Sequence, residues 1–154
     1  MLRPTKKLAL VIEAIVDIAL RSEKGLVQSQ HVSDRMGLPK RYLEDVIQQL
    51  VRAGVLKGVR GPHGGYRLAD ERRNITVGRI IAVVEGLEED DGGVPTSSSP
   101  LGENLIGPFW VELEGELMGI LNSITVDDLC RRAKSIDGAA FSQRPRRIPA
   151  EAVA

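Results

Sequence analysis

The residues best suited to chemistry lie at positions 55–68, which read VLKGVRGPHGGYRL. Two short runs of strand-forming residues flank a turn rich in glycine, a pattern that predicts two β-strands joined in a tight hairpin. Arg60 and Gly61 open the turn, so the guanidinium group would project from the hairpin tip. The narrow, negatively charged minor groove of DNA attracts a guanidinium group in such a position. The hairpin therefore predicts contact with a duplex.

The residues directly before the hairpin predict two short helices joined by a turn. The first helix begins at or just before Ser29 and ends at Gly37, while the second has Pro39 in its first turn and closes at Gly54. The inward stripe of the second helix consists of Leu43, Val46, Ile47 and Leu50. Its opposite face carries Arg41, Glu44, Asp45 and Gln48.

That polar face has two interpretations. It supplies hydrogen-bond donors and acceptors that suit base edges in the major groove, or it is a solvated helix surface. The order of helix, turn, helix and basic hairpin is that of a winged helix-turn-helix, which places its second helix in the major groove. This order favours DNA reading. The predicted fold class is mainly α, with a small two-stranded antiparallel wing and a long helix.

The rest of the sequence predicts a scaffold for this reading unit. Helices are expected at about 6–21 and 77–85, and Thr76 would cap the second. A further short helix follows Thr125, whose hydroxyl would form a capping box with Asp128. The chain then divides into a DNA-binding domain (1–85), an acidic and polar loop (86–107), the long helix with the short helix after it (108–134), and a flexible tail (135–154).

A long helix is predicted from about Pro108 to Ser123. Its apolar residues recur every three or four positions, at Trp110, Leu113, Leu117, Ile120 and Ile124. Such a stripe either packs on the core of its own chain or pairs with a second copy. We favour a homodimer, because proteins that read DNA commonly gain specificity from two-fold symmetry.

Charge is distributed unevenly along the 154 residues. Lys and Arg number 15 against 9 Asp and Glu over residues 1–85, whereas residues 86–154 hold 6 against 12. Only the first part is therefore expected to face a polyanion. The sequence lacks any run of about 18 apolar residues, which argues against a membrane partner. Its single cysteine excludes an internal disulfide and favours a cytoplasmic location.

Several short motifs follow one another in a characteristic order: Leu20-Arg21-Ser22, Tyr42-Leu43-Glu44, Val59-Arg60-Gly61-Pro62, Gly64-Gly65-Tyr66, Ile75-Thr76-Val77, Trp110 and Ile124-Thr125-Val126-Asp127-Asp128-Leu129. In this order they resemble the Rrf-two family of bacterial winged-helix regulators. The resemblance implies a homodimeric, sequence-specific transcriptional regulator whose long helices cross in the interface. Binding to a palindromic operator is expected, and repression is favoured because no surface for recruiting polymerase is evident.

The resemblance also implies roles for individual side chains. Arg41, Glu44 and Asp45 would face bases, and Tyr42 would contact a backbone phosphate. Arg60 and Gly61 would enter the minor groove, whereas His63 is either a phosphate contact or a plain turn residue. The residues expected to contact DNA are Lys7, Gln28, Lys40, Arg41, Tyr42, Glu44, Asp45, Gln48, Arg60, Gly61, His63 and Gly64. Tyr66 is interpreted as a packing residue of its strand.

The chain departs from the family in its cysteines. Many members carry three cysteines in the loop before the long helix, and these hold an iron–sulfur cluster. Here the loop contains none, and the sole cysteine, Cys130, lies downstream. Cluster ligation normally needs about four thiolate or imidazole ligands. No cofactor is therefore expected, and an acidic, solvated loop is preferred over a cation site at Glu88, Glu89, Asp90 and Asp91.

Two alternatives to a simple operator-binding regulator remain open. Arg131 and Arg132 follow Cys130 and could lower the pKa of its thiol, which would suit a redox sensor, although a lone helical cysteine is more often a small buried hydrophobe. The acidic second half could instead dock a protein partner or a small effector. An enzyme is not expected, because no catalytic triad spacing or phosphate-binding loop is present.

Overall fold

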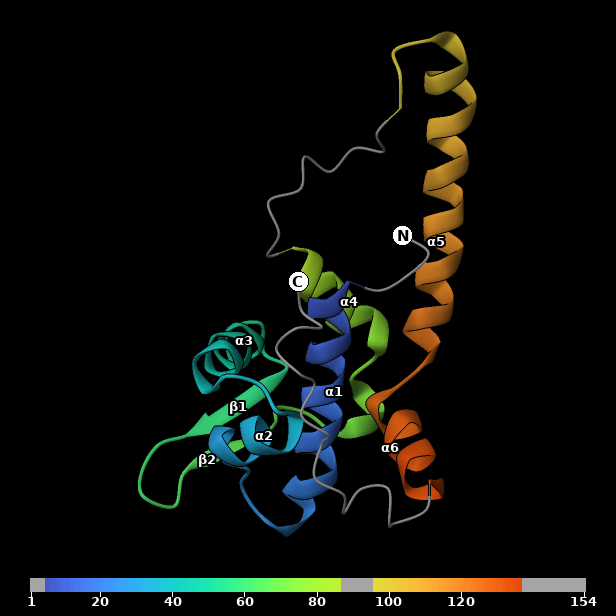
Figure 1. The fold of residues 1–154 in the computed structure, drawn as a ribbon. Coiled ribbons are helices and arrows are strands. Elements are labelled where there is room, and N and C mark those ends of the chain that lie inside the picture. Colours follow the sequence, from blue (N-terminus) through green and yellow to red (C-terminus); the bar gives the residue numbers. More distant parts are fainter. Residues whose placement is uncertain (1–4, 87–95, 137–154) are drawn as a thin grey trace.

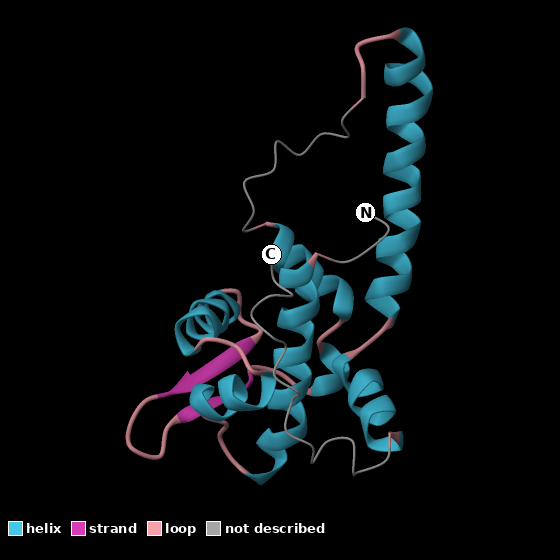
Figure 2. Cartoon of the chain, viewed as in Figure 1, coloured by secondary structure: helices cyan, strands magenta, loops and turns pink. Residues whose placement is uncertain are grey.

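The computed structural model describes residues 5–86 and 96–136, which form a mainly helical structure with one small sheet (Figure 1, Figure 2). The elements are α1 (Lys6–Arg21), η1 (Ser22–Lys24), α2 (Ser29–Met36), α3 (Lys40–Arg52), β1 (Leu56–Val59), β2 (Gly65–Leu68), η2 (Arg72–Asn74), α4 (Val77–Glu85), the π-helical turn η3 (Gly102–Ile106), α5 (Gly107–Ser123) and α6 (Val126–Ser135). The predicted fold class is confirmed, as are the predicted helices at 6–21 and 77–85.

The hydrophobic core gathers buried side chains from α1, α3 and α4. Ile15 and Ile18 of α1, Ile47 of α3 and Ile80 of α4 expose no surface. Burying a side chain of this size stabilises the fold by about 1.5–3 kcal/mol. The predicted inward stripe of α3 is also confirmed, because all four of its apolar residues are buried. Helix α3 is therefore fixed to the body along its apolar side.

The turn between α2 and α3 ends α2 where the sequence predicts. Gly37 adopts the left-handed conformation, with φ 65° and ψ 29°. The Ser33 hydroxyl donates a hydrogen bond to the Leu38 carbonyl at 2.6 Å, which holds the turn closed. The predicted place of Pro39 inside the first turn of α3 is wrong by one residue. The helix begins at Lys40, because Pro39 has a helical φ of −59° but an extended ψ of 133°.

The wing is a hairpin of β1 and β2, as predicted. The two strands pair antiparallel, with Leu56 opposite Leu68 and Val59 opposite Gly65. At the tip, Gly61 has a φ of 119°, a region that side chains other than glycine rarely adopt. Gly64 is required for a different reason, since a Cβ there would collide with the Val59 carbonyl oxygen.

A single residue outside the hairpin extends this sheet. The Val27 N–H donates to the Tyr66 carbonyl at 2.9 Å, and the Tyr66 N–H donates to the Val27 carbonyl at 2.8 Å. Gly65 makes this approach possible, because a Cβ there would lie 2.8 Å from the Val27 carbonyl oxygen. The wing is therefore tied to the segment that leads into α2.

The short helix after α5 joins the winged domain through its first residues. The predicted capping box of α6 is confirmed, with Thr125 and Asp128 exchanging side-chain and backbone hydrogen bonds at 2.9 and 3.0 Å. Thr125 also forms an isolated antiparallel bridge with Thr76, the residue that caps α4. Beside this bridge, Gly78 lies directly against Asn122 of α5.

The predicted loop at 86–107 extends too far toward the C-terminus. Helical structure begins at Pro100 and continues through η3 into α5. The Ser99 hydroxyl accepts a hydrogen bond from the Gly102 N–H at 3.1 Å, and proline suits a first helical turn. Ser135 likewise belongs to α6 and not to the tail. Residues 87–95, with their four acidic side chains, and residues 137–154 lie outside the described part of the chain.

Helix α5 has no buried residue in the described chain. Figure 1 shows its N-terminal half extending past the winged domain, while its C-terminal half runs beside α4. Only Met118, Leu121 and the following Ile124 pack against the core of the same chain. The described helices include none that combines the length and apolar character needed to cross a membrane.

Candidate nucleic-acid interface

A groove of about 530 Å³ lies between the start of α2, the exposed face of α3 and the wing. Six of the residues predicted to contact DNA line it, namely Gln28, Lys40, Gln48, Arg60, Gly61 and Gly64. They come from three segments of the sequence, the residue before α2, α3 and the turn of the wing, which the fold brings together. The groove therefore joins the predicted reading helix and the predicted minor-groove hairpin in one surface.

The other predicted residues of α3 lie beside the groove and do not line it. Arg41, Tyr42 and Asp45 are exposed, and Glu44 is half-buried. Lys40 Nζ lies 3.7 Å from Glu44 Oε1, one turn along the helix. Both side chains are about half exposed, and such surface pairs contribute little to stability. Glu44 can therefore exchange this ion pair for a contact with a base without a large loss.

The wing tip carries an exposed arginine, Arg60. Arg60 is exposed and has no hydrogen-bond or ion-pair partner among the described residues. The positive φ of Gly61 turns the chain immediately after it. His63 is also exposed at the tip. A guanidinium group held at a tight turn with its donors unused is well placed to bind an anionic groove.

Lys7 lies apart from the other predicted contacts. It is half-buried on the first turns of α1 and does not line the groove. Gln28 is the other predicted contact that lies outside α3 and the wing. It is exposed, stands directly before α2 and lines the groove. The groove thus gathers the predicted residues on the helix-turn-helix and the wing, and Lys7 would have to reach DNA from a separate element.

Sequence reasoning missed three polar side chains of the groove. Ser29 and Gln30 at the start of α2 line it, and so does Tyr66 of β2. The Tyr66 hydroxyl accepts a hydrogen bond from Gln48 Nε2 at 3.2 Å. Tyr66 is half-buried and packs against the core, so the predicted packing role is confirmed, but it also reaches the reading helix. No local pattern signals a contact between residues 18 positions apart.

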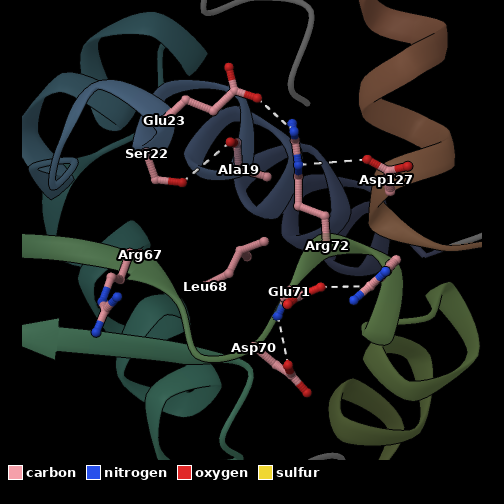
Figure 3. A pocket seen from close by; sticks show the side chains of 10 residues that line it. Ala19, Ser22, Glu23, Arg67, Leu68, Asp70, Glu71, Arg72 and Asp127 are labelled. Atoms are coloured by element: carbon pink, nitrogen blue, oxygen red, sulfur yellow. Dashed lines mark hydrogen bonds and ion pairs between the residues drawn. The ribbon is translucent and has the colours of Figure 1, made fainter.

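A second hollow of about 540 Å³ lies on another side of the winged domain, between η1, η2 and the start of α6. Figure 3 shows Arg72 between Glu23 and Asp127. Arg72 Nη2 lies 2.6 Å from Glu23 Oε1, and its Nε lies 3.7 Å from Asp127 Oδ1. Lys134 also hydrogen-bonds Glu23, and with Arg72 it holds the pKa of that carboxyl below its ordinary value. The cluster ties α6 to the body.

Of the two interpretations of Cys130, the structure favours the preferred one, a small buried hydrophobe, over activation by Arg131 and Arg132. Arg131 pairs with Asp127 at 3.3 Å and with Asp128, on the exposed side of α6. Cys130 itself is buried. Burial raises the pKa of its thiol above the ordinary value, although Arg72 beside it acts in the opposite direction. A buried thiol held protonated is a poor nucleophile.

Two helices joined by a glycine turn, with a basic wing beside the second, define a winged helix-turn-helix DNA-binding protein of the kind that regulates transcription. Residues 4–132 match the Rrf2 family, described as an iron-dependent transcriptional regulator. The chain belongs to this family. The expected membership is confirmed.

Named relatives agree with this assignment. The chain is 34% identical to the HTH-type transcriptional regulator IscR of Photobacterium profundum, over 84% of this chain and 76% of that protein. It is 33% identical to IscR of Escherichia coli, over 88% of this chain and 85% of that protein. Among solved structures, T. potens IscR superposes with a TM-score of 0.69 at 33% identity, covering 85% of this chain and 88% of that one.

A second solved structure shows the same fold. CymR, the global cysteine regulator of B. subtilis, superposes with a TM-score of 0.69 at 26% identity, covering 86% of this chain and 98% of that one. Together with the family match, these relatives make this chain a DNA-binding transcriptional regulator.

The donor set of this chain does not fit an iron–sulfur cluster. The whole sequence offers one cysteine, and that residue is buried in α6. Its two histidines lie elsewhere, His31 on α2 and His63 at the wing tip. Within residues 5–86 and 96–136, no three His, Cys, Asp or Glu side chains are grouped so as to hold a metal ion. The described part of the chain therefore does not assemble the ligands that such a cluster requires.

Proposed function

We propose that this regulator acts as a homodimer that represses transcription by covering a palindromic operator, with α5 as the dimer interface. The observation that carries the proposal is the unpartnered apolar face of α5. Phe109, Leu113, Leu117 and Ile120 expose between 38% and 61% of their surface. Their spacing of four, four and three residues places them on one side of the helix.

That face is too large and too apolar to remain in water. It runs over three turns of the helix, and contiguous apolar patches of this kind mark protein interfaces. A second copy supplies an identical face, so pairing across a two-fold axis buries both at once. The N-terminal half of α5 extends past α4 (Figure 1). A two-fold axis also places two reading helices on one side of a duplex, which matches a palindrome.

Within each protomer, the exposed face of α3 and the wing tip would contribute to recognition in different ways. Arg41, Glu44 and Asp45 on the exposed face of α3 would read base edges. Tyr42, Lys40 and Lys7 would contact phosphates, which position the protein without reading sequence. Arg60 would enter the minor groove beside the reading helix. Because phosphate contacts release counterions, affinity should fall steeply with salt.

Regulation in this proposal needs neither a cluster nor a reactive thiol. The cysteine set does not suit a cluster, and burial of Cys130 weighs against a redox sensor. The alternative of a protein partner on the acidic half is likewise not needed to account for DNA binding. A regulator of this kind would work in the cytoplasm, where bacterial DNA lies, and would not require a membrane.

The test compares two charge insertions on α5. Leu113→Glu places a carboxylate in the middle of the proposed interface, whereas Val111→Glu places it on the opposite side of the helix at a residue that is 62% exposed. We expect sedimentation equilibrium to show a monomer for Leu113→Glu and a dimer for Val111→Glu. Binding to a two-site operator should fall at least tenfold for the monomer only. A dimeric Leu113→Glu protein would contradict the proposed interface.

A further inference from the structure

Tyr66 connects three parts of the DNA-facing surface through one side chain and its backbone. Its hydroxyl lies 3.2 Å from Gln48 Nε2 of α3. Its N–H and carbonyl both pair with Val27, one residue before the start of the α2 segment that lines the groove. Its ring lies against Gly58 of β1, where a Cβ would be 3.3 Å from the ring. A shift of α3, β1 or the segment before α2 would therefore change a contact of Tyr66.

The hydrogen bond acts on a residue that would otherwise be free to rotate. Gln48 is exposed, and the Tyr66 hydroxyl is its one partner among the described residues. An exposed glutamine samples many rotamers, and ordering it on binding costs conformational entropy. A partner that fixes the side chain before binding removes part of that cost. Tyr66 is suited to this task because packing in the wing already holds its ring.

We propose that Tyr66 is a positioning residue for sequence reading, which holds the Gln48 amide in the groove between α3 and the wing. Gln48 then meets base edges with an orientation set in the free protein. The inference deepens the proposed function, because it rests on this groove facing DNA.

The physical basis of the proposal separates the hydroxyl from the ring. Tyr66→Phe retains the ring and its contact with β1 and removes only the bond to Gln48. One such hydrogen bond corresponds to a change of about two- to tenfold in an equilibrium. The effect should be confined to the base pairs that Gln48 faces, because α3 and the phosphate contacts remain in place.

The experiment is an operator-selection assay with Tyr66→Phe, Gln48→Ala and the double variant, with Ser135→Ala as the matched control. The Ser135 hydroxyl donates a hydrogen bond to the Arg132 carbonyl in α6. Ser135→Ala therefore removes one hydroxyl hydrogen bond and leaves the groove unchanged. We expect Tyr66→Phe and Gln48→Ala to relax preference at the same base pairs, by about two- to tenfold. The double variant should be no worse than Gln48→Ala alone.

Two results would overturn the assignment. Additive losses in the double variant would show that Tyr66 and Gln48 act independently. A uniform loss of affinity over all sequences, or a lowered melting temperature of Tyr66→Phe, would make Tyr66 a phosphate contact or a purely structural residue. Arg60→Ala separates the two levels of the argument. If Arg60→Ala abolishes operator binding while Tyr66→Phe retains full base preference, only the role of Tyr66 fails. If Arg60→Ala also binds normally, the groove itself is not the interface.

Discussion

The winged domain buries its apolar side chains, whereas α5 leaves most of its own exposed. In the winged domain, α1, α3 and α4 bury their apolar faces in one shared core, and Ile15, Ile47 and Ile80 are wholly enclosed. Helix α5 is just as apolar in its sequence, yet none of its residues is buried within the described chain. The first region is covered by its own chain, whereas the second would be one half of the proposed dimer interface. In that proposal, folding and association depend on different parts of the sequence.

The strongest test of this comparison uses one isoleucine from each region. Ile47→Ala should lower the free energy of unfolding by about 2–5 kcal/mol, because it leaves a cavity in a packed core. It should leave the dimer dissociation constant almost unchanged. Ile120→Ala should do the reverse, weakening dimerisation while each folded protomer keeps its core.

Urea unfolding and sedimentation equilibrium on the same samples measure both quantities. The comparison fails if Ile120→Ala lowers the unfolding midpoint of a protomer as much as Ile47→Ala does while association is unaltered. That pair of results would mean that the α5 face is covered by the chain's own residues.

A smaller effect is expected from a substitution on the outer face of α3, the polar face that the winged domain leaves exposed. Glu44→Ala should lose about 1–3 kcal/mol of discrimination at one base pair and keep most of its affinity for unrelated DNA. Its stability should be unaffected, because the pair with Lys40 is exposed at both ends. Competition binding with single-base operator variants measures the discrimination. Full retention of preference would show that this face does not read bases.

The smallest effect concerns the junction between the two regions, at the start of α6. Hydrogen bonds from the backbone and side chain of Thr125 hold the pKa of Asp128 below its ordinary value. A depressed carboxyl pKa contributes stability above the ordinary pKa of about 4, and the contribution is lost as the pH falls through the lower folded value. The melting temperature should therefore fall in acid. Asp128→Asn should show a shallower fall than the native protein, and an equally steep one would remove Asp128 as a cause.

The parts of the fold that local chemistry determines were predictable. Helix periodicity placed the buried face of α3, Gly37 and Thr76 marked a helix end and a helix start, and the glycines of the hairpin marked the wing. The start of the long helix was not predictable, because Ser99 and Pro100 stand in a polar, serine-rich stretch that suits a loop equally well. The start of the helix depends on the hydrogen bond from the Gly102 N–H to the Ser99 hydroxyl, which composition does not reveal.

The candidate site divides along the same line. Arg60, a charged residue at a turn, and Gln48, a polar residue on a helix face, could be singled out from the sequence. The hydrogen bond from Gln48 to Tyr66 and the approach of Arg72 to Cys130 could not, because each depends on elements that meet only in the folded chain. Sequence neighbours were a poor guide to Cys130, since helix geometry turns Arg131 outward to Asp127.

The missing side chain at Gly78 has a consequence for spacing along the duplex. Because a Cβ there would collide with the Asn122 side chain, α5 can sit as close to α4 as it does only with a hydrogen at this position. If α5 forms the two-fold contact, that closeness helps to fix how far apart two wings stand and how they are rotated about the axis. The number of base pairs between the two halves of a target site would then depend on one absent methyl group, far from any atom that touches a nucleotide.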